Sequence, residues 1–229
     1  MAKIKRAIGT CGIMWSDMVS SQFMHSLNQM LLYSQQTLCG PDEYIHYIWA
    51  KASYHELGRS ELVDNCEGDW LLSLDTDHQF QPDLLERLLH LKKREKSRVM
   101  SGIYCYKMPP YGPVANLWGD KGQVIPLGAW DPKLEVLQVG PVGAGCLLVD
   151  KDVFTQIKCE LRQAPFHIIQ GLSEDYSFCK RCRDLKIPIH LAMKVECHHL
   201  APRHVIHVSD YVDQFRPAFD QAKALSQKT

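Results

Sequence analysis

Long apolar runs are missing from this sequence of 229 residues, and with them the signature of a membrane span. No segment approaches the ~20 consecutive apolar residues that a transmembrane helix needs. The basic start of the chain, residues 1–6, leads into a short strand pattern rather than into the apolar core of a signal peptide. We therefore expect a protein that is neither membrane-spanning nor secreted, located in the cytoplasm, or in the host cytoplasm if its origin is viral.

A surplus of charge is missing as well, because 26 lysines and arginines balance 26 aspartates and glutamates. This balance disfavours bulk nucleic acid and anionic membranes as partners, since both attract strongly basic proteins. The nine cysteines are an odd number scattered mostly through apolar segments. That pattern is typical of free thiols in a reducing compartment.

Internal repeats, low-complexity segments and clear linkers are also absent. With 45% hydrophobic residues, a chain of this length is able to build one large core. We therefore expect a single α/β domain over residues 1–229.

Hydrophobic segments alternate between strand and helix periodicity through the first half of the chain. This alternation is typical of a mostly parallel, doubly wound sheet. After Pro109-Pro110, proline and glycine become frequent, and short strands at 124–125 and 135–139 predict a small antiparallel part. The other strands are expected over residues 4–8, 44–50, 70–74, 99–106, 147–149 and 187–197, and helices after Asp17 or Ser20, over 59–66, from Pro82, over 150–159, from Ser173 and in the tail.

Two carboxylates one residue apart, Asp75 and Asp77, follow the apolar run 70–74. Side chains at positions i and i+2 of a strand leave on the same face, so the two carboxylates would lie side by side. The carboxyl end of such a strand is where ligands bind in open α/β sheets. Two adjacent carboxylates repel each other unless a cation lies between them, and Mg²⁺ or Mn²⁺ suits oxygen ligands. A solvated turn or helix cap is the alternative.

A second acidic pair, Glu174-Asp175, follows Ser173 at the start of a predicted helix. Acidic residues are favoured in a first helical turn by the helix dipole, which is one interpretation. The other is a carboxylate that accepts a proton from a substrate hydroxyl.

Adjacent histidines, His198 and His199, end the last predicted strand. Strand alternation places His199 on the face of Val195 and Cys197, and His198 on the opposite face. A histidine at a strand end is a common metal ligand, although a structural role is the alternative. Alternation favours His199 over His198 as the ligand.

The order and spacing of these three constellations resemble the GT-A-fold glycosyltransferases of family 2, a large inverting family that uses nucleotide sugars. The likeness is to the compact single-domain versions found in phages and bacteria. It covers most of residues 4–200 in the segments AIGTCGIMWSDMVSSQFMHSLNQMLL, GRSELVDNCEGDWLLSLDTDHQFQPDLLERLL, MSGIYCYKMPP, VGAGCLLVDKDVF and GLSEDYSFCKRCRDLKIPIHLAMKVECHHL.

The resemblance implies a hexosyl- or pentosyltransferase that moves a sugar from a nucleotide diphosphate sugar to an acceptor hydroxyl. Residues 75–77 would be its Asp-x-Asp motif, in which Asp77 ligates Mn²⁺ or Mg²⁺ and Asp75 lies near the ribose or a metal-bound water. His199 would complete the metal site. Asp175, beside Glu174, would be the general base.

The nucleotide-sugar half would span residues 1–107 and the acceptor half, with the C-terminal tail, 108–229. Gly9, Thr10 and Gly12 would lie in the loop that wraps the nucleotide, and Arg59 would neutralise its phosphate. Gly145 would either let the backbone approach the donor sugar or form a plain tight turn.

The sequence departs from the family pattern in two places. No carboxylate that would hold the nucleotide base follows the second strand in residues 50–53, although a UDP-sugar stays the favoured donor. The usual Ala-Arg-Asn triplet reads Gly58-Arg59-Ser60. The sequence leaves open the oligomeric state and an acceptor that is a polysaccharide, a protein or a modified nucleobase.

Two other functions compete with this interpretation. A non-catalytic zinc module would use Cys179, Cys182, Cys197 and one of the late histidines. A nucleotidyltransferase of similar fold would need a glycine-rich loop with a basic residue, which residues 9–12 lack.

Overall fold

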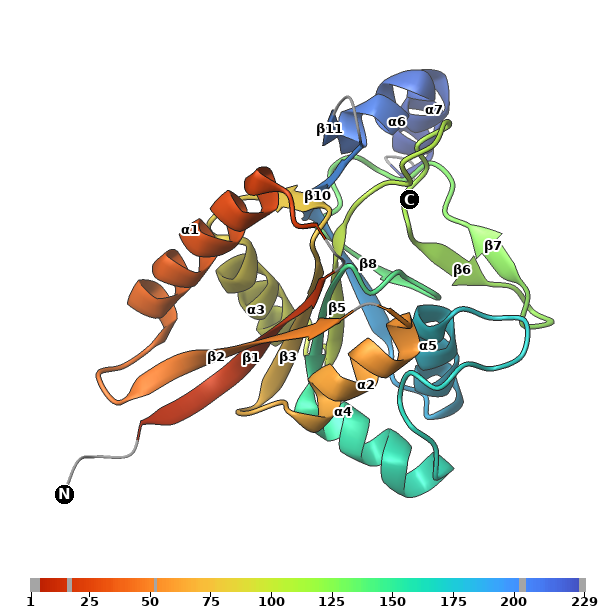
Figure 1. Cartoon of the computed structure of the whole chain (residues 1–229). Coiled ribbons are helices and arrows are strands. Elements are labelled where there is room, and N and C mark those ends of the chain that lie inside the picture. The colour runs from red at the N-terminus through yellow and green to blue at the C-terminus, as the bar shows by residue number, and fades with distance from the viewer. Residues whose placement is uncertain (1–4, 16–17, 52, 202–204, 227–229) are drawn as a thin grey trace.

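A mixed β-sheet forms the centre of the computed structural model, which describes residues 5–15, 18–51, 53–201 and 205–226. Its strands follow the order β11-β10-β5-β9-β3-β1-β2 (Figure 1). They are β1 (Arg6–Trp15), β2 (Glu43–Lys51), β3 (Trp70–Asp75), β5 (Val99–Ile103), β9 (Cys146–Asp150), β10 (Ile189–Leu200) and β11 (Val205–Ile206).

Five strands of this sheet, β1, β2, β3, β5 and β10, run in the same direction. β1 runs parallel to both β2 and β3, and β5 runs parallel to β10. β9 lies between β3 and β5 and is antiparallel to both. The α/β class with a mostly parallel sheet is therefore confirmed.

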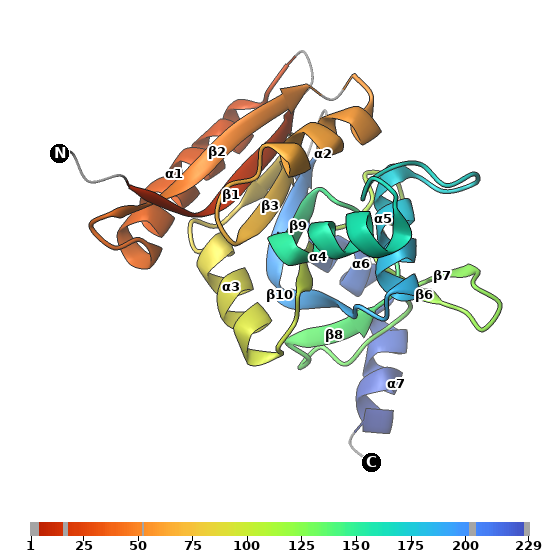
Figure 2. The same cartoon turned by 90° about the horizontal axis from the view of Figure 1, so that it is seen from below.

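The second half of the chain contributes short antiparallel strands, as predicted. One pair, β6 with β7, forms a separate hairpin that projects from the body (Figures 1 and 2). Two other short strands, β4 and β8, pair with different parts of β10. The bounds of these elements are β4 (His78–Phe80), β6 (Asn116–Trp118), β7 (Val124–Pro126) and β8 (Val136–Val139), followed after β11 by α6 (Val208–Gln214) and α7 (Arg216–Ser226).

Helices cover both faces of the sheet (Figures 1 and 2). One face carries α1 (Ser21–Leu38) and α3 (Leu84–Arg94). The other carries α2 (His55–Asp64), α4 (Lys151–Gln156) with the π-helical turn Ile157–Leu161, and α5 (Glu174–Asp184). Within the described ranges, none of the helices combines the length and apolar character needed to cross a membrane.

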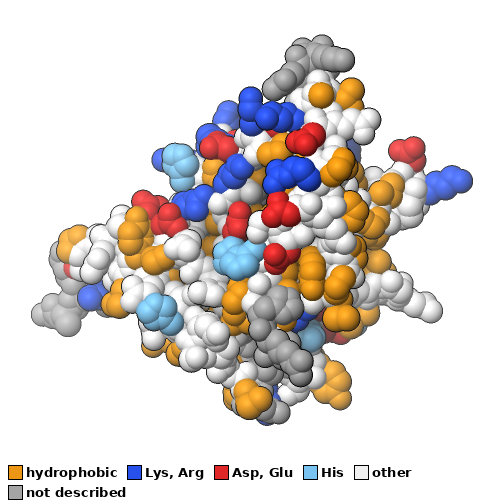
Figure 3. Space-filling model, turned by 90° about the horizontal axis from the view of Figure 1, so that it is seen from above, with side chains coloured by type: hydrophobic (Ala, Val, Ile, Leu, Met, Phe, Trp, Pro, Cys, Tyr) orange, Lys and Arg blue, Asp and Glu red, His pale blue; other side chains and the backbone are white. Residues whose placement is uncertain are grey.

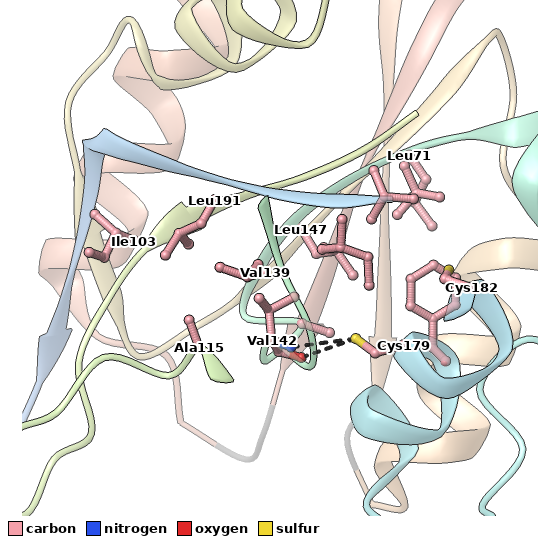
Figure 4. Packing of buried hydrophobic residues seen from close by; sticks show 14 of the residues in the cluster. Leu71, Ile103, Ala115, Val139, Val142, Leu147, Cys179, Cys182 and Leu191 are labelled. Carbon is pink, nitrogen blue, oxygen red and sulfur yellow. Dashed lines mark hydrogen bonds between the residues drawn. The ribbon is translucent and has the colours of Figure 1, made fainter. Parts of the chain in front are cut away.

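The buried run of β3 explains this three-layer arrangement. Leu72 and Leu74 join the apolar cluster beneath α1 and α3, whereas Leu71 joins the cluster beneath α2, α4 and α5. A strand that is buried on both faces is almost continuously apolar, and in β3 only Ser73 interrupts the apolar run before Asp75. Figure 4 shows the second cluster, in which the Cys179 thiol of α5 contacts the backbone of Val142.

Several predicted boundaries differ from the structure. β1 continues to Trp15 instead of ending at residue 8, because Gly9 and Gly12 are packing positions and not a loop. A Cβ on Gly9 would lie 2.1 Å from the Trp70 ring. α2 begins at His55, four residues earlier than expected. Ser20 is the N-cap of α1 and accepts a hydrogen bond from the Phe23 N–H, whereas Asp17 lies outside the described residues.

Candidate active site

Asp75 and Asp77 lie where β3 leaves the core. Asp75 is the last residue of β3 and is in register with Met14 near the end of β1. Because residues 70–74 are buried, the chain reaches the surface at the two carboxylates. Ligands bind at this edge in open α/β sheets. In the face shown in Figure 3, acidic, basic and histidine side chains lie close together near the centre.

The short strand β4 brings His78 beside His199. The two residues are direct partners in the antiparallel pair of β4 and β10. Directly opposed residues in such a pair project to the same face. Their rings are stacked, with centroids 4.4 Å apart and planes inclined by 10°.

Asp77, His78 and His199 together form a group able to hold a metal ion. One potential ligand atom from each lies within 4.8 Å of the other two. Asp77 Oδ1 is 3.6 Å from His78 Nδ1 and 3.9 Å from His199 Nε2. Among the described residues, no other set of three or more His, Cys, Asp or Glu side chains meets this spacing.

Unpartnered polar atoms mark the same place. Asp77 Oδ1 and both ring nitrogens of His78 are buried without a hydrogen-bond partner. A buried polar atom left unpaired costs about 1–3 kcal/mol, so several at one spot call for a ligand. A carboxylate oxygen and imidazole nitrogens are suitable donors for a divalent cation, and these residues therefore fit one.

The orientation of His199 favours the same role. Its Nδ1 lies 2.5 Å from the carbonyl oxygen of Cys105 and donates a hydrogen bond to it. The proton on Nδ1 leaves the lone pair of Nε2 directed toward Asp77, as in metal-binding histidines with a backbone partner. His198 lies elsewhere, with its ring 4.3 Å from that of His207. The structure thus brings His199, and not His198, to Asp77.

Burial and charge set the protonation of the three groups. Burial lowers the pKa of His78 from 6.5 to about 4, although the Asp77 charge opposes the shift. Burial also lowers the pKa of His199. Burial alone would raise the pKa of Asp77, but contacts with His78, Lys107 and His199 outweigh it and the pKa lies below its usual value. Neutral imidazoles and a charged carboxylate are the forms that bind metals.

Asp75 is held by Arg59 and lies outside the metal-binding group. Arg59 Nη2 donates to Asp75 Oδ1 at 2.7 Å, and Nη1 donates to the Ser73 hydroxyl. The Arg59 side chain is only 2% exposed. The early start of α2 turns Arg59 onto the buried face of the helix, beside Leu62. The geometry therefore favours Arg59 as a partner of Asp75 over the predicted contact with nucleotide phosphate.

Gly145 lies against both parts of the site. Its carbonyl oxygen accepts the Asp75 N–H at 3.1 Å, and its own N–H donates to the Tyr104 hydroxyl at 3.1 Å. A Cβ at this position would lie 2.5 Å from His78 Cε1 and 3.0 Å from Asp75 Oδ2. Glycine therefore lets the backbone come close to both side chains.

The other predicted nucleotide-binding residues lie away from this edge. Gly9, Thr10 and Gly12 are inside β1, before its carboxyl end. Thr10 is fully buried and its hydroxyl bonds with the Glu67 backbone. The prediction that these residues form a loop is wrong, because Trp70 and Leu62 pack onto the glycines. Their position does not favour contact with a nucleotide.

The acidic pair lies at the start of α5, for which Ser173 is the N-cap. Asp175 Oδ1 accepts hydrogen bonds from the Ser173 hydroxyl and from the Tyr176 N–H. Burial first, and then the neighbouring Asp175 charge, raise the pKa of Glu174. After burial, the charges of Asp75 and Asp175 both contribute to the raised pKa of Tyr104.

Three residues of this site were not predicted from the sequence. They are His78, Tyr104 and Lys107, whose Nζ lies 2.5 Å from Asp77 Oδ2. Only His78 carried a local signal, since it directly follows Asp77. The Tyr104 ring makes edge contacts with both histidine rings, at 4.7 and 5.2 Å between centroids.

The alternative zinc set is not brought together. Cys179 and Cys182 are buried in α5, and Cys179 bonds with Val142. Neither belongs to a metal-binding group in the described part of the chain. The phosphate loop that a nucleotidyltransferase would need at residues 9–12 is replaced by strand β1.

Comparison with known proteins agrees with the fold. Residues 35–127 match the model of the family Glycosyl transferase family 2. The crystal structure of A197 from STIV has a TM-score of 0.56 at 15% identity, over 88% of this chain and 93% of that chain. The structure of GalNAc-T7 with UDP, GalNAc and Mn²⁺ has a TM-score of 0.52 at 10% identity, over 86% of this chain and 43% of that chain. No curated protein matches the sequence.

The sheet, its covering helices and the structural likeness define a protein of the GT-A fold. Together with the match over residues 35–127, this fold supports a family-2-like glycosyltransferase. The resemblance inferred from the sequence is thereby confirmed.

Proposed function

We propose that this enzyme needs a divalent cation to transfer a sugar from a nucleotide diphosphate sugar, a UDP-sugar above all, to an acceptor hydroxyl with inversion. The group of Asp77, His78 and His199 carries this proposal, because its buried donor atoms lack partners at the ligand-binding edge of the sheet. When bound there, the cation would stabilise the negative charge that develops on the departing diphosphate.

The donor set favours Mn²⁺ over Mg²⁺. Mg²⁺ prefers oxygen ligands and retains several waters, whereas imidazole nitrogen suits transition metals. Two of the three ligands here are imidazoles. The structure of GalNAc-T7, which shares the fold, holds UDP and Mn²⁺.

We assign Asp75 to the ribose or to a metal-bound water. Its salt bridge to the buried Arg59 fixes the carboxylate, and its backbone N–H is bonded to Gly145. Because the carboxylate is already oriented, it loses little conformational entropy when it bonds with the ribose or with the water. Gly145 would allow the donor sugar to approach the backbone.

We assign the general base to Asp175. Its two hydrogen bonds both involve Oδ1, and Oδ2 takes part in neither. A base must face the acceptor hydroxyl on the side of the sugar opposite the leaving diphosphate if the anomeric carbon is to be inverted. An acidic residue on α5, a separate element from the metal-binding strands β4 and β10, supports this arrangement.

Thermal unfolding of the purified protein with MnCl₂, UDP or both tests the metal and nucleotide sites. We expect the combination to raise the Tm most, because ligands stabilise the folded state they bind. Asp77→Asn should remove the part of the Tm increase that depends on Mn²⁺. Asp69→Asn, an exposed carboxylate before the other end of β3, is the matched control.

Transfer is then measured with the UDP-sugar that gives the largest shift, and NMR of the anomeric proton reports the stereochemistry. A Mn²⁺-dependent shift that survives in Asp77→Asn would contradict the metal assignment. Retained anomeric configuration would contradict the role of Asp175.

A further inference from the structure

Lys107 places an ammonium group directly on the proposed metal ligand. It lies after β5, and its Nζ is 2.5 Å from Asp77 Oδ2. The histidines approach the other carboxylate oxygen, Oδ1. Asp77 is therefore shared between a positive side chain on one oxygen and a set of metal donors on the other.

A divalent ion bound at Asp77 would be a close neighbour of this ammonium. Two like charges a few ångströms apart repel each other at the effective dielectric constant of a protein surface. The ammonium also takes up part of the negative charge that the carboxylate would offer to the ion. Lys107 therefore opposes binding of the ion alone.

Lys107 is also able to move. Its side chain is 39% exposed, and the lysine stem is flexible with freely rotating donors. Asp77 is 42% exposed, so the salt bridge lies at the surface, where such pairs contribute little to stability. A diphosphate near the ion would offer the ammonium a more strongly charged partner.

We propose that the Lys107 ammonium competes with the divalent cation for Asp77. When cation and donor bind together, the ammonium moves from Asp77 to form an ion pair with the donor diphosphate. This inference rests on the proposed function, because it needs a cation at Asp77. It makes Lys107 a coupling residue: the ion binds weakly alone, and the nucleotide strengthens its binding. By thermodynamic linkage, the ion strengthens nucleotide binding by the same factor.

Mn²⁺ binding by isothermal titration calorimetry, with and without UDP, tests the inference. Lys107→Met keeps an unbranched, flexible side chain and removes its charge. We expect this variant to bind Mn²⁺ alone roughly tenfold more tightly than the wild type, as the loss of a nearby like charge predicts. The factor by which UDP tightens Mn²⁺ binding should fall. Lys121→Met, an exposed lysine between β6 and β7, is the control and should match the wild type.

The outcomes separate the two proposals. Equal Mn²⁺ affinities and equal UDP effects in the wild type and Lys107→Met would overturn the role of Lys107 while leaving the metal site intact. Binding that is unchanged by Asp77→Asn, or absent from every variant with and without UDP, would overturn the metal site and the role of Lys107 with it. Circular dichroism of each variant confirms that it is folded.

Discussion

The guanidinium of Arg59 lies 2.7 Å from the carboxylate of Asp75, and it is almost completely buried. It also bonds with the Ser73 hydroxyl, so one side chain from α2 contacts two residues of β3. This contact fixes the end of β3 at the point where the chain turns toward Asp77. The position of Asp77, the proposed metal ligand, thus depends on the salt bridge between Arg59 and Asp75.

Removal of Arg59 should therefore cost stability. In Arg59→Met, the Asp75 carboxylate loses its partner in a partly buried position, and we expect the free energy of unfolding to fall by roughly 3 kcal/mol. Urea denaturation measures the change. The exposed pair of Arg6 and Asp69 gives the control, since Arg6→Met should cost less than about 1 kcal/mol. Equal losses in the two variants would contradict a special role for Arg59.

Addition of one methyl group at Gly145 should damage the metal site. The new Cβ would lie 2.5 Å from His78 Cε1, so the fully buried ring would have to shift away from its present position. We expect Gly145→Ala to weaken Mn²⁺ binding by about 10–100-fold, as for other changes that disturb the support of metal ligands. Gly128→Ala is the matched control, because its Cβ meets no atom within 4 Å. Calorimetry that finds equal affinities in both variants would argue against His78 as a ligand.

Stability should fall as the pH is lowered from about 6.5 to 4. Burial lowers the pKa of His78 to about 4, so over this range the unfolded chain binds a proton that the folded chain does not. The stability that this group contributes is fully present above pH 6.5 and is lost toward pH 4, with a total of about 3 kcal/mol. Urea denaturation in EDTA at pH 7 and pH 5 measures the loss. The side chain in His78→Phe does not titrate, so this variant should lose less stability than the wild type between pH 7 and pH 5. An equal loss in both proteins would contradict the lowered pKa of His78.

Substitutions of Asp175 and Glu174 should distinguish a catalytic role from a structural one. Asp175→Asn removes the proposed base, and we expect transfer to fall by about 10²–10⁴-fold with little change in UDP binding. Glu174→Gln is the matched neighbour and should retain most of the transfer activity. Steady-state kinetics, together with calorimetry for UDP, distinguish the two effects. The reverse ranking would identify Glu174, whose pKa is raised by burial, as the base.

The sequence could predict the features that depend on a pattern of apolar and polar residues within one segment. The run before Asp75 is apolar except for Ser73, which predicted a buried strand with a carboxylate at its end. Alternation along β10 separated His199 from His198, and the structure places them apart in the same way. The antiparallel direction of β9 was not predictable, because a short buried strand shows the same apolar run in either direction.

The missed features depend on contacts between distant segments. β4 has three residues, too few to show any period, so its pairing with β10, which brings His78 to His199, had no signal in the sequence. Gly9 and Gly12 are typical of a loop, yet they are glycines because Trp70 and Leu62 occupy the space of a side chain. Arg59 was predicted to neutralise the nucleotide phosphate, but its helix begins one turn earlier and the side chain is buried against Asp75.

The pairing of β4 with β10 joins two segments that lie far apart in the sequence. His78 is translated early, and its partner His199 leaves the ribosome only after almost all of the sheet has been synthesised. Contacts between residues so far apart in sequence form late and slowly. Cation capture at this pair would therefore report the completion of folding, and a nascent chain would stay inactive until its last long strand is in place.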